Sequence, residues 1–186
     1  MQEASQYSYE GLDNFTQDLG TVWMSRSDRL PLSQLDGGKR GARRARRLTK
    51  GRPWVWFHDD ERGNREWFKD QHSEHFVVVT FSHFSPFHEA LQRVMPCDAV
   101  VTDIFFPMKW PSDHDEANRL MSIYNRIRDS PVGKLPELWK DVRDEWDLAG
   151  FAAVKALREV RHGMYKQVPA FLFSRKATLL LNTGDW

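Results

Sequence analysis

The sequence of 186 residues contains a single cysteine, Cys97, and no long run of apolar residues. One cysteine excludes an internal disulfide framework and a cysteine-based metal cluster, and it fits a reducing compartment. No apolar stretch approaches the roughly 20 residues that a membrane-spanning helix requires. The polar segment Met1–Gly20 is unlike a signal peptide. We therefore expect a cytoplasmic protein without a membrane segment.

The chain also lacks a surplus of charge of one sign, since its formal net charge is +1. No overall field therefore directs it to nucleic acid or to a membrane surface. The exception is local, because eight Lys and Arg residues lie between Lys39 and Arg52. No aromatic residue lies among them, so they make a poor platform for stacking bases. We interpret this cluster as a solvated linker or helix face, and nucleic-acid binding through Lys39–Arg52 is the less favoured reading.

The hydrophobic pattern divides the chain into an extension and a domain. Residues 1–52 show no sustained periodicity, so we predict an N-terminal extension that ends in the basic linker. Within it, Leu30–Leu32 and Leu35 could add a short turn of helix. Residues 53–186 form the predicted domain, and the polar stretch 109–146 inside it is predicted to be a helical insert.

Short apolar runs bounded by turn residues predict four strands, at residues 53–57, 76–81, 99–102 and 168–173. Helix-like segments follow the first two strands and precede the fourth. Asp60 is expected to cap the first of these helices, with Trp67 and Phe68 turned inward. The alternation of strands and helices predicts an α/β fold with a doubly wound parallel sheet.

Polar residues follow three of these strands directly. Asp59 and Asp60 come after the first strand, Asp103 after the third and Ser174 after the fourth. The carboxyl ends of parallel strands meet at one edge of the sheet, and α/β proteins bind ligands there. Three carboxylates in one cleft repel each other unless a cation is present, and Mg²⁺ or Mn²⁺ prefers such oxygen ligands.

This arrangement predicts phosphoryl chemistry. A divalent ion bound by Asp59, Asp60 and Asp103 would leave room for a phosphoryl group. Asp103 would then be the nucleophile that forms an aspartyl phosphate. Ser174 could donate a hydrogen bond to a phosphoryl oxygen.

The segments that carry these residues resemble the receiver domain of two-component response regulators. The likeness rests on Trp-Phe-His-Asp59-Asp60-Glu, Val-Val-Thr-Asp103-Ile-Phe-Phe-Pro107-Met and Ala-Phe-Leu-Phe-Ser174, and Asp147-Leu-Ala-Gly150 resembles the family's entry to its third helix. The resemblance implies a flavodoxin-like fold, Mg²⁺ bound by the two acids of the first motif and phosphorylation of Asp103. It also implies that Ser174 senses the phosphoryl group. A histidine kinase or a phosphotransfer protein would be the donor.

The sequence departs from this family in two places. The family carries a lysine at the end of a fifth strand, whereas too little chain follows Ser174 for the usual fourth helix, fifth strand and final helix. Lys176 and Lys109 are cations near the predicted site, but neither has the family's position. The second departure is the insert at 109–146, which lies beside the site and could gate access or contact a partner.

Four functions therefore remain open. The favoured one is a signalling module that accepts a phosphoryl group on Asp103 and acts on an output protein not identified by the sequence. The second is a degenerate receiver that serves as a scaffold for proteins without phosphorylation. A metal-dependent phosphatase or nuclease and a nucleic-acid-binding protein are the third and fourth.

Overall fold

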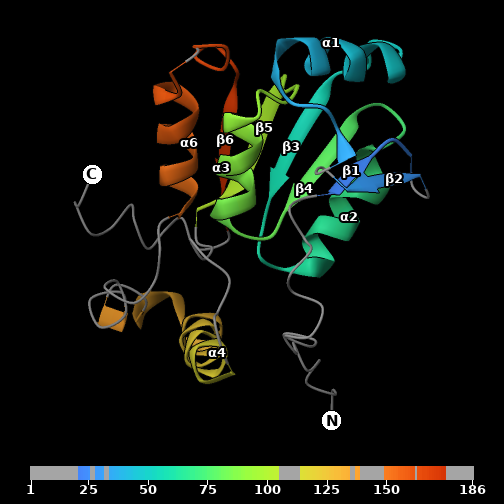
Figure 1. Ribbon diagram of the computed structural model, residues 1–186. Helices are drawn as coiled ribbons and strands as arrows, with labels where there is room; N and C mark the ends of the chain where they lie inside the picture. Colours follow the sequence, from blue (N-terminus) through green and yellow to red (C-terminus); the bar gives the residue numbers. More distant parts are fainter. Residues whose placement is uncertain are drawn as a thin grey trace.

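The structure, a computed structural model, describes residues 21–25, 28–31, 34–104, 114–134, 137–138, 149–161 and 163–174. Within these ranges the chain forms an α/β fold, in which helices pack against one mixed sheet (Figure 1). The expected α/β class is thereby confirmed. No helix in the described ranges is long and apolar enough to cross a membrane.

The described strands form one sheet in the order β2-β1-β4-β3-β5-β6. Its parallel part consists of β3 (Trp54–His58), β4 (Val77–Phe81), β5 (Ala99–Asp103) and β6 (Ala170–Phe173). Its antiparallel part consists of β1 (Thr21–Trp23) and β2 (Arg29–Pro31). The four strands predicted from the sequence are therefore present and lie side by side, with bounds shifted by one or two residues.

The two antiparallel strands come from the segment that was predicted to be an extension. Val22 of β1 is buried and pairs with Val79 of β4. The indole N–H of Trp23 donates to the hydroxyl of Thr80 at 3.3 Å. The prediction of a helical turn around Leu30 is wrong, because Arg29–Pro31 pairs with β1 as a strand. The described residues between positions 21 and 52 thus contribute to the same sheet and core as the rest.

The described helices are α1 (Gly38–Leu48), α2 (Arg62–His72), α3 (Phe84–Gln92), α4 (His114–Asp129) and α6 (Ala149–Glu159), with the 3₁₀ helix η3 (Val132–Lys134) after α4. Helices α3 and α6 lie side by side on one face of the sheet (Figure 1). On that face Phe87 of α3 meets Trp56 edge to face, with ring centroids 5.3 Å apart. Helix α2 lies on the opposite face, because Phe68 stacks on Phe57 and successive strand residues point to opposite faces.

Helix α2 differs from the prediction in two details. Its N-cap residue is Glu61 and not Asp60. Phe68 faces the sheet as expected, but Trp67 is 60% exposed. Neighbouring helical residues are separated by roughly 100° around the axis, so only one of the two rings can face the sheet.

Trp56 lies at the centre of the core. Strand β3 is buried along its whole length. The ring of Trp56 lies 5.3 Å from Phe81 and 5.7 Å from Tyr165, measured between centroids. Its indole N–H donates to the carbonyl of Pro96 at 2.7 Å, which satisfies the polar group of this buried side chain.

Asp98 joins α1 to the amino ends of the central strands. The guanidinium of Arg46 donates two hydrogen bonds to this carboxylate at 2.7 and 2.8 Å, and the backbone N–H of Trp54 donates a third at 2.8 Å. Burial opposes ionisation of Asp98, but these hydrogen bonds and the charge of Arg46 prevail and lower its pKa. Figure 1 accordingly shows α1 across the amino-end edge of the sheet.

Replacement of Asp98 by Ala is expected to lower the free energy of unfolding by about 1–3 kcal/mol, because the N–H of Trp54 loses its acceptor and Arg46 its partner. Asp36→Ala is the matched control, since the ion pair of Asp36 with Arg44 is 67% and 69% exposed. Its loss should cost less than about 1 kcal/mol. Urea denaturation measures both values, and equal losses in the two variants would contradict the role of Asp98.

Candidate functional site

Three carboxyl groups meet at the carboxyl ends of the two central strands. β3 ends at His58 and is followed by Asp59 and Asp60, whereas β5 ends at Asp103. His58 pairs in register with Thr102, so Asp59 and Asp103 follow neighbouring positions of adjacent parallel strands. The negative charge of Asp103 raises the pKa values of both Asp59 and Asp60. The structure therefore brings the three predicted acids together at one edge of the sheet.

Asp59 is buried and holds the start of α2. Its Oδ1 accepts a hydrogen bond from the backbone N–H of Glu61 at 2.8 Å, and its Oδ2 accepts one from the amide of Asn64 at 3.0 Å. Burial raises its pKa well above the usual range, and the charges of Asp60 and Asp103 add to this effect. The two hydrogen bonds offset the rise only in part. Asp59 thus braces the turn that leads into α2, whose N-cap residue is Glu61.

The pKa of Asp60 is raised as well. Burial, followed by the charges of Asp103 and Glu61, raises its pKa to about 7. The positive charge of Arg65 acts in the opposite direction but does not cancel them. The Arg65 guanidinium also donates to the carbonyl oxygens of Asp59 and Asp60 at 2.6 and 2.7 Å, which fixes the loop. Near neutral pH this carboxyl therefore exchanges a proton readily, and a bound cation would favour the ionised form.

Asp103 is half-buried, and its Oδ1 accepts a hydrogen bond from the backbone N–H of Ile104 at 2.7 Å. Asp103 pairs in register with Phe173 of β6. Ser174 follows Phe173 immediately and is half-buried, so it lies at the same edge as the three acids. The structure thus brings all four predicted site residues to this edge of the sheet.

Gly150 allows α6 to approach the backbone next to Asp103. Its N–H donates to the carbonyl of Ile104 at 3.1 Å. A Cβ atom at this position would lie 2.2 Å from the carbonyl oxygen of Asp103 and 2.7 Å from the Cα of Ile104. No side chain fits such a gap. The α6 N-terminus can therefore lie this near to the site only because residue 150 is a glycine.

The donor set suits a hard divalent cation in its chemistry, because it consists of carboxylate oxygens whose charges repel each other. Asp59, Asp60 and Asp103 are the residues that could hold it. Asp59 is the least suited of them, since both of its oxygens already accept hydrogen bonds. Among the described residues, no three acidic, His or Cys side chains are arranged as a ready-made metal site.

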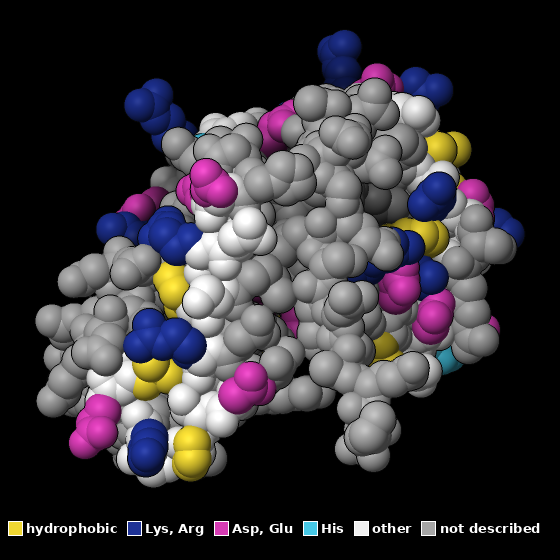
Figure 2. Space-filling view, turned by 90° about the horizontal axis from the view of Figure 1, so that it is seen from below, with side chains coloured by type: hydrophobic (Ala, Val, Ile, Leu, Met, Phe, Trp, Pro, Cys, Tyr) yellow, Lys and Arg dark blue, Asp and Glu magenta, His cyan; other side chains and the backbone are white. Residues whose placement is uncertain are grey.

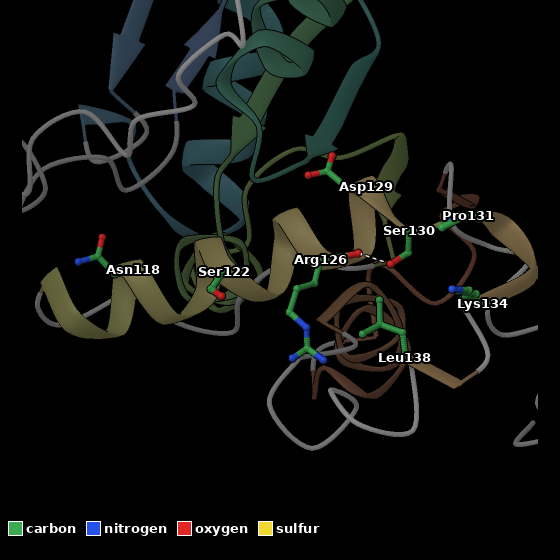
Figure 3. A pocket seen from close by; sticks show the side chains of 8 residues that line it. All are labelled: Asn118, Ser122, Arg126, Asp129, Ser130, Pro131, Lys134 and Leu138. Atoms are coloured by element: carbon green, nitrogen blue, oxygen red, sulfur yellow. Dashed lines mark hydrogen bonds between the residues drawn. The ribbon is translucent and has the colours of Figure 1, made fainter.

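Other predicted features of the site fall outside the described residues. Lys109, Pro107 and Lys176 are among them, as are large parts of the insert at 109–146. The described part of the insert consists of α4, η3 and residues 137–138. Figures 1 and 3 show α4 beyond the carboxyl ends of the strands. The three acids lie at these same ends.

An open groove on the insert was not foreseen from the sequence. It has a volume of about 760 Å³ and runs between the end of α4 and the residues after it (Figure 3). Arg126, Asp129 and Lys134 line it with both signs of charge, and Leu138 supplies an apolar wall. The break at Ser130-Pro131 is the sequence signal for this corner, and the hydroxyl of Ser130 donates to the carbonyl of Arg126 at 2.6 Å.

The end of the molecule that carries the insert has no surface of a single charge sign among its described side chains. Figure 2, which views the molecule from this end, shows acidic and basic side chains interspersed. Asp59 is fully buried and so withdrawn from that surface, whereas Asp60 is half-buried. The candidate site is therefore a local cluster at the sheet edge rather than part of a broad acidic surface.

Comparison with known proteins finds no relative: no family model, no curated protein and no solved structure matches this chain.

The close approach at Gly150 predicts that Gly150→Ala destabilises the fold by about 2 kcal/mol or more, because the new methyl group would push α6 away from β5. Gly63→Ala is the matched control. Gly63 also lies in a helix, but nothing surrounds its Cβ position within 4 Å. That change should stabilise the protein by up to about 1 kcal/mol through helix propensity. Thermal unfolding followed by circular dichroism measures both, and a neutral Gly150→Ala would contradict the steric argument.

The raised pKa values of Asp59 and Asp60 predict a loss of stability as the pH rises. Their folded-state pKa values exceed the unfolded value near 4, so the native state binds more protons between about pH 4 and pH 7. Their contribution to the free energy of unfolding therefore decreases through this window. Buried His58 acts in the opposite sense, because burial lowers its pKa.

The measurable quantity is thus the difference in unfolding free energy between the wild type and Asp60→Asn, determined by urea denaturation in EDTA across this pH range. The wild type should lose stability relative to the variant as the pH increases. Asp115→Asn, which removes an exposed carboxyl group of α4, is the matched control. A pH-independent difference for Asp60→Asn would contradict the raised pKa.

Proposed function

We propose that this chain is a receiver-like signalling module that accepts a phosphoryl group on Asp103 in a Mg²⁺-dependent phosphorelay. The observation that carries the proposal is the meeting of three mutually repelling carboxyl groups where β3 and β5 end. Such a cluster disfavours its own full ionisation, and a cation with a phosphoryl ligand is the chemistry that relieves this repulsion.

The topology of the parallel strands supports the same reading. In chain order they are β3, β4, β5 and β6, and across the sheet they lie as second, first, third and fourth. This order is that of the flavodoxin-like doubly wound fold, to which receiver domains conform. Helices on both faces and the three acids at the carboxyl ends also agree with it. The proposed fold is therefore a receiver-like one, extended by β1 and β2 at the β4 edge.

In the proposed reaction, a carboxylate oxygen of Asp103 attacks the phosphorus of a phosphohistidine on a kinase or phosphotransfer protein. The P–N bond breaks, the imidazole leaves with the electron pair, and an acyl phosphate forms on Asp103. The backbone N–H of Ile104 orients the attacking carboxylate through Oδ1. Ser174 donates a hydrogen bond to a phosphoryl oxygen. The module is a phosphoacceptor rather than an enzyme with turnover.

Asp60 and Asp103, assisted by Asp59, would hold the Mg²⁺ ion. The ion would supply positive charge to the phosphoryl oxygens, which the three carboxylates would otherwise repel. Asp59 contributes mainly by fixing the loop through Glu61 and Asn64. Phosphorylation is expected to change the contacts of an output protein, and the insert beside the site is a surface that such a partner could use.

Asp103→Asn is expected to abolish labelling by radioactive acetyl phosphate, because the amide is not a nucleophile toward phosphorus. The matched control is Asp115→Asn, which changes charge in the same way on the exposed surface of α4 and should label as the wild type does. EDTA should abolish labelling of the wild type. Persistent labelling of Asp103→Asn, in protein shown to be folded, would exclude this residue as the phosphoacceptor.

A phosphorylation-independent scaffold is the second candidate, and two observations favour it. The described residues contain no ready-made group of three metal ligands. Strand β6 also exposes Phe171 and Phe173, which are 58% and 37% accessible, and exposed apolar surface is typical of protein contacts. Tryptophan fluorescence during titration with Mg²⁺ and beryllofluoride separates the candidates, because Trp54 and Trp56 lie on the strand that leads to Asp59. A saturable response supports the phosphoacceptor, and no response supports the scaffold.

A further inference from the structure

Helix α1 carries an unusual concentration of positive charge. Its eleven residues include Lys39, Arg40, Arg43, Arg44, Arg46 and Arg47, and they include no acid. The opposite side of the helix is small and buried, with Gly41, Ala42 and Ala45 against the fold. The basic cluster in the sequence is thus one face of a rigid, docked helix.

Only a minority of the cations in this region stabilise the fold. Arg46 binds Asp98, and Arg52 donates to the carbonyl of Ser73 at 3.0 Å. Arg44 forms an ion pair with Asp36 that is largely exposed. Five further cations are exposed and form no ion pair or side-chain hydrogen bond within the described part of the chain: Lys39, Arg40, Arg43, Arg47 and Lys50.

Three of these unpaired charges, at positions 39, 40 and 43, are unfavourable for the helix itself. Arg47 lies in the last turn, where the helix dipole favours a cation. Arg43 and Arg47 lie four residues apart on one face, and like charges at this spacing repel. Lys39 and Arg40 lie in the first turn, where the helix dipole disfavours cations and no acid compensates. Packing does not require them, because the buried contacts come from the small residues. A charged surface that costs stability without a structural return is expected at a binding site.

The geometry suits a linear polyanion. Eleven helical residues span about 16 Å, and Arg40, Arg43 and Arg47 follow one another along this length on the solvent side. Double-stranded DNA carries one negative charge per about 1.7 Å of its axis, so a helix of this length faces several phosphates. Guanidinium groups bind phosphate oxygens through two hydrogen bonds, which favours arginine over lysine at such a surface.

An anionic membrane fits this surface less well. A helix that binds at a membrane inserts an apolar face between the lipids. The small apolar face of α1 is buried in the fold, and Leu48 is the large apolar side chain that the helix exposes, at 63%. Aromatic residues are absent from α1, so single strands would find no stacking platform there. The backbone of a duplex matches this surface in charge and requires neither an inserted apolar face nor aromatic side chains.

The position of α1 keeps such a ligand away from the acids. Helix α1 lies across the amino ends of the strands, whereas Asp59, Asp60 and Asp103 lie at the carboxyl ends (Figure 1). The net charge of +1 is therefore the sum of opposite local charges: a basic helix at the amino ends of the strands and an acidic cluster at their carboxyl ends. From these observations we infer that the solvent-facing side of α1 binds the phosphate backbone of double-stranded DNA without reading its sequence.

The test is fluorescence anisotropy of the full chain with a fluorescein-labelled random-sequence DNA duplex at increasing salt. If the five unpaired cations each neutralise one phosphate, log K falls with log salt concentration with a slope of about −4.5. Affinity then decreases by about 500-fold between about 50 and about 200 mM salt. The triple variant Arg40→Gln, Arg43→Gln, Arg47→Gln should show a slope of about −1.8, and its affinity should decrease only about tenfold over the same range.

Two variants control this measurement. Arg119→Gln, Arg126→Gln, Lys134→Gln removes the same charge from exposed positions on the insert and should retain the wild-type slope. Arg40→Lys, Arg43→Lys, Arg47→Lys keeps the charge of α1 and should show the wild-type slope, in contrast to the glutamine variant. Far-UV circular dichroism verifies the fold of each variant.

Three outcomes would overturn the inference. The first is the absence of duplex binding by the wild type at low salt. The second is an equal loss of binding in the insert variant and the α1 variant, which would indicate a general charge effect. The third is binding to vesicles of phosphatidylcholine and phosphatidylserine without binding to the duplex, which would assign α1 to a membrane surface.

Discussion

Burial of β3 on both of its faces is the constraint on which the other features of the structure depend. Trp56 requires partners from α3 and from the segment that carries Tyr165, while Phe57 requires α2 on the opposite face. A strand enclosed in this way must lie between two other strands, and β4 and β5 occupy those places. Asp59 follows β3 directly and is still fully buried, which is why its carboxyl group is desolvated and resists ionisation. The acidity of the site is thus a consequence of how the core is packed.

The same strands connect two chemically different ends of the molecule. At the amino ends, Asp98 receives hydrogen bonds from Arg46 and from the backbone of Trp54, so its charge is fully compensated. At the carboxyl ends, the charge of Asp103 raises the pKa of Asp60, and the charge of Arg65 compensates this only in part. Both ends use carboxyl groups next to strand β3 or β5, but only the second retains electrostatic energy that a ligand could release. This difference separates a structural acid from a candidate functional one more clearly than residue type does.

The sequence predicted those parts of the fold in which local pattern and tertiary burial agree. The four parallel strands are apolar runs because both of their faces are covered, and their order along the chain implied the shared edge of Asp59 and Asp103. β1 and β2 could not be predicted, because three residues are too few to show alternation and their pairing with β4 is a long-range contact. Asp60 was predicted to cap α2, but the N-cap residue is Glu61 and Asp59 braces the turn before it, a difference that residue type alone does not reveal. The close contact between Gly150 and the backbone of Asp103 likewise depends on tertiary packing, which residue type alone does not reveal.

The pairing of β1 with β4 also bears on how the chain reaches its fold. Thr21 pairs with Thr80, so forming this contact closes a long loop and costs conformational entropy. On the ribosome, β1 emerges well before β4 has been made, and its backbone groups must remain hydrated in the meantime. The edge of β4 is correspondingly open until the N-terminal hairpin docks. That interval is when the nascent chain is most exposed to strand-mediated association with other chains.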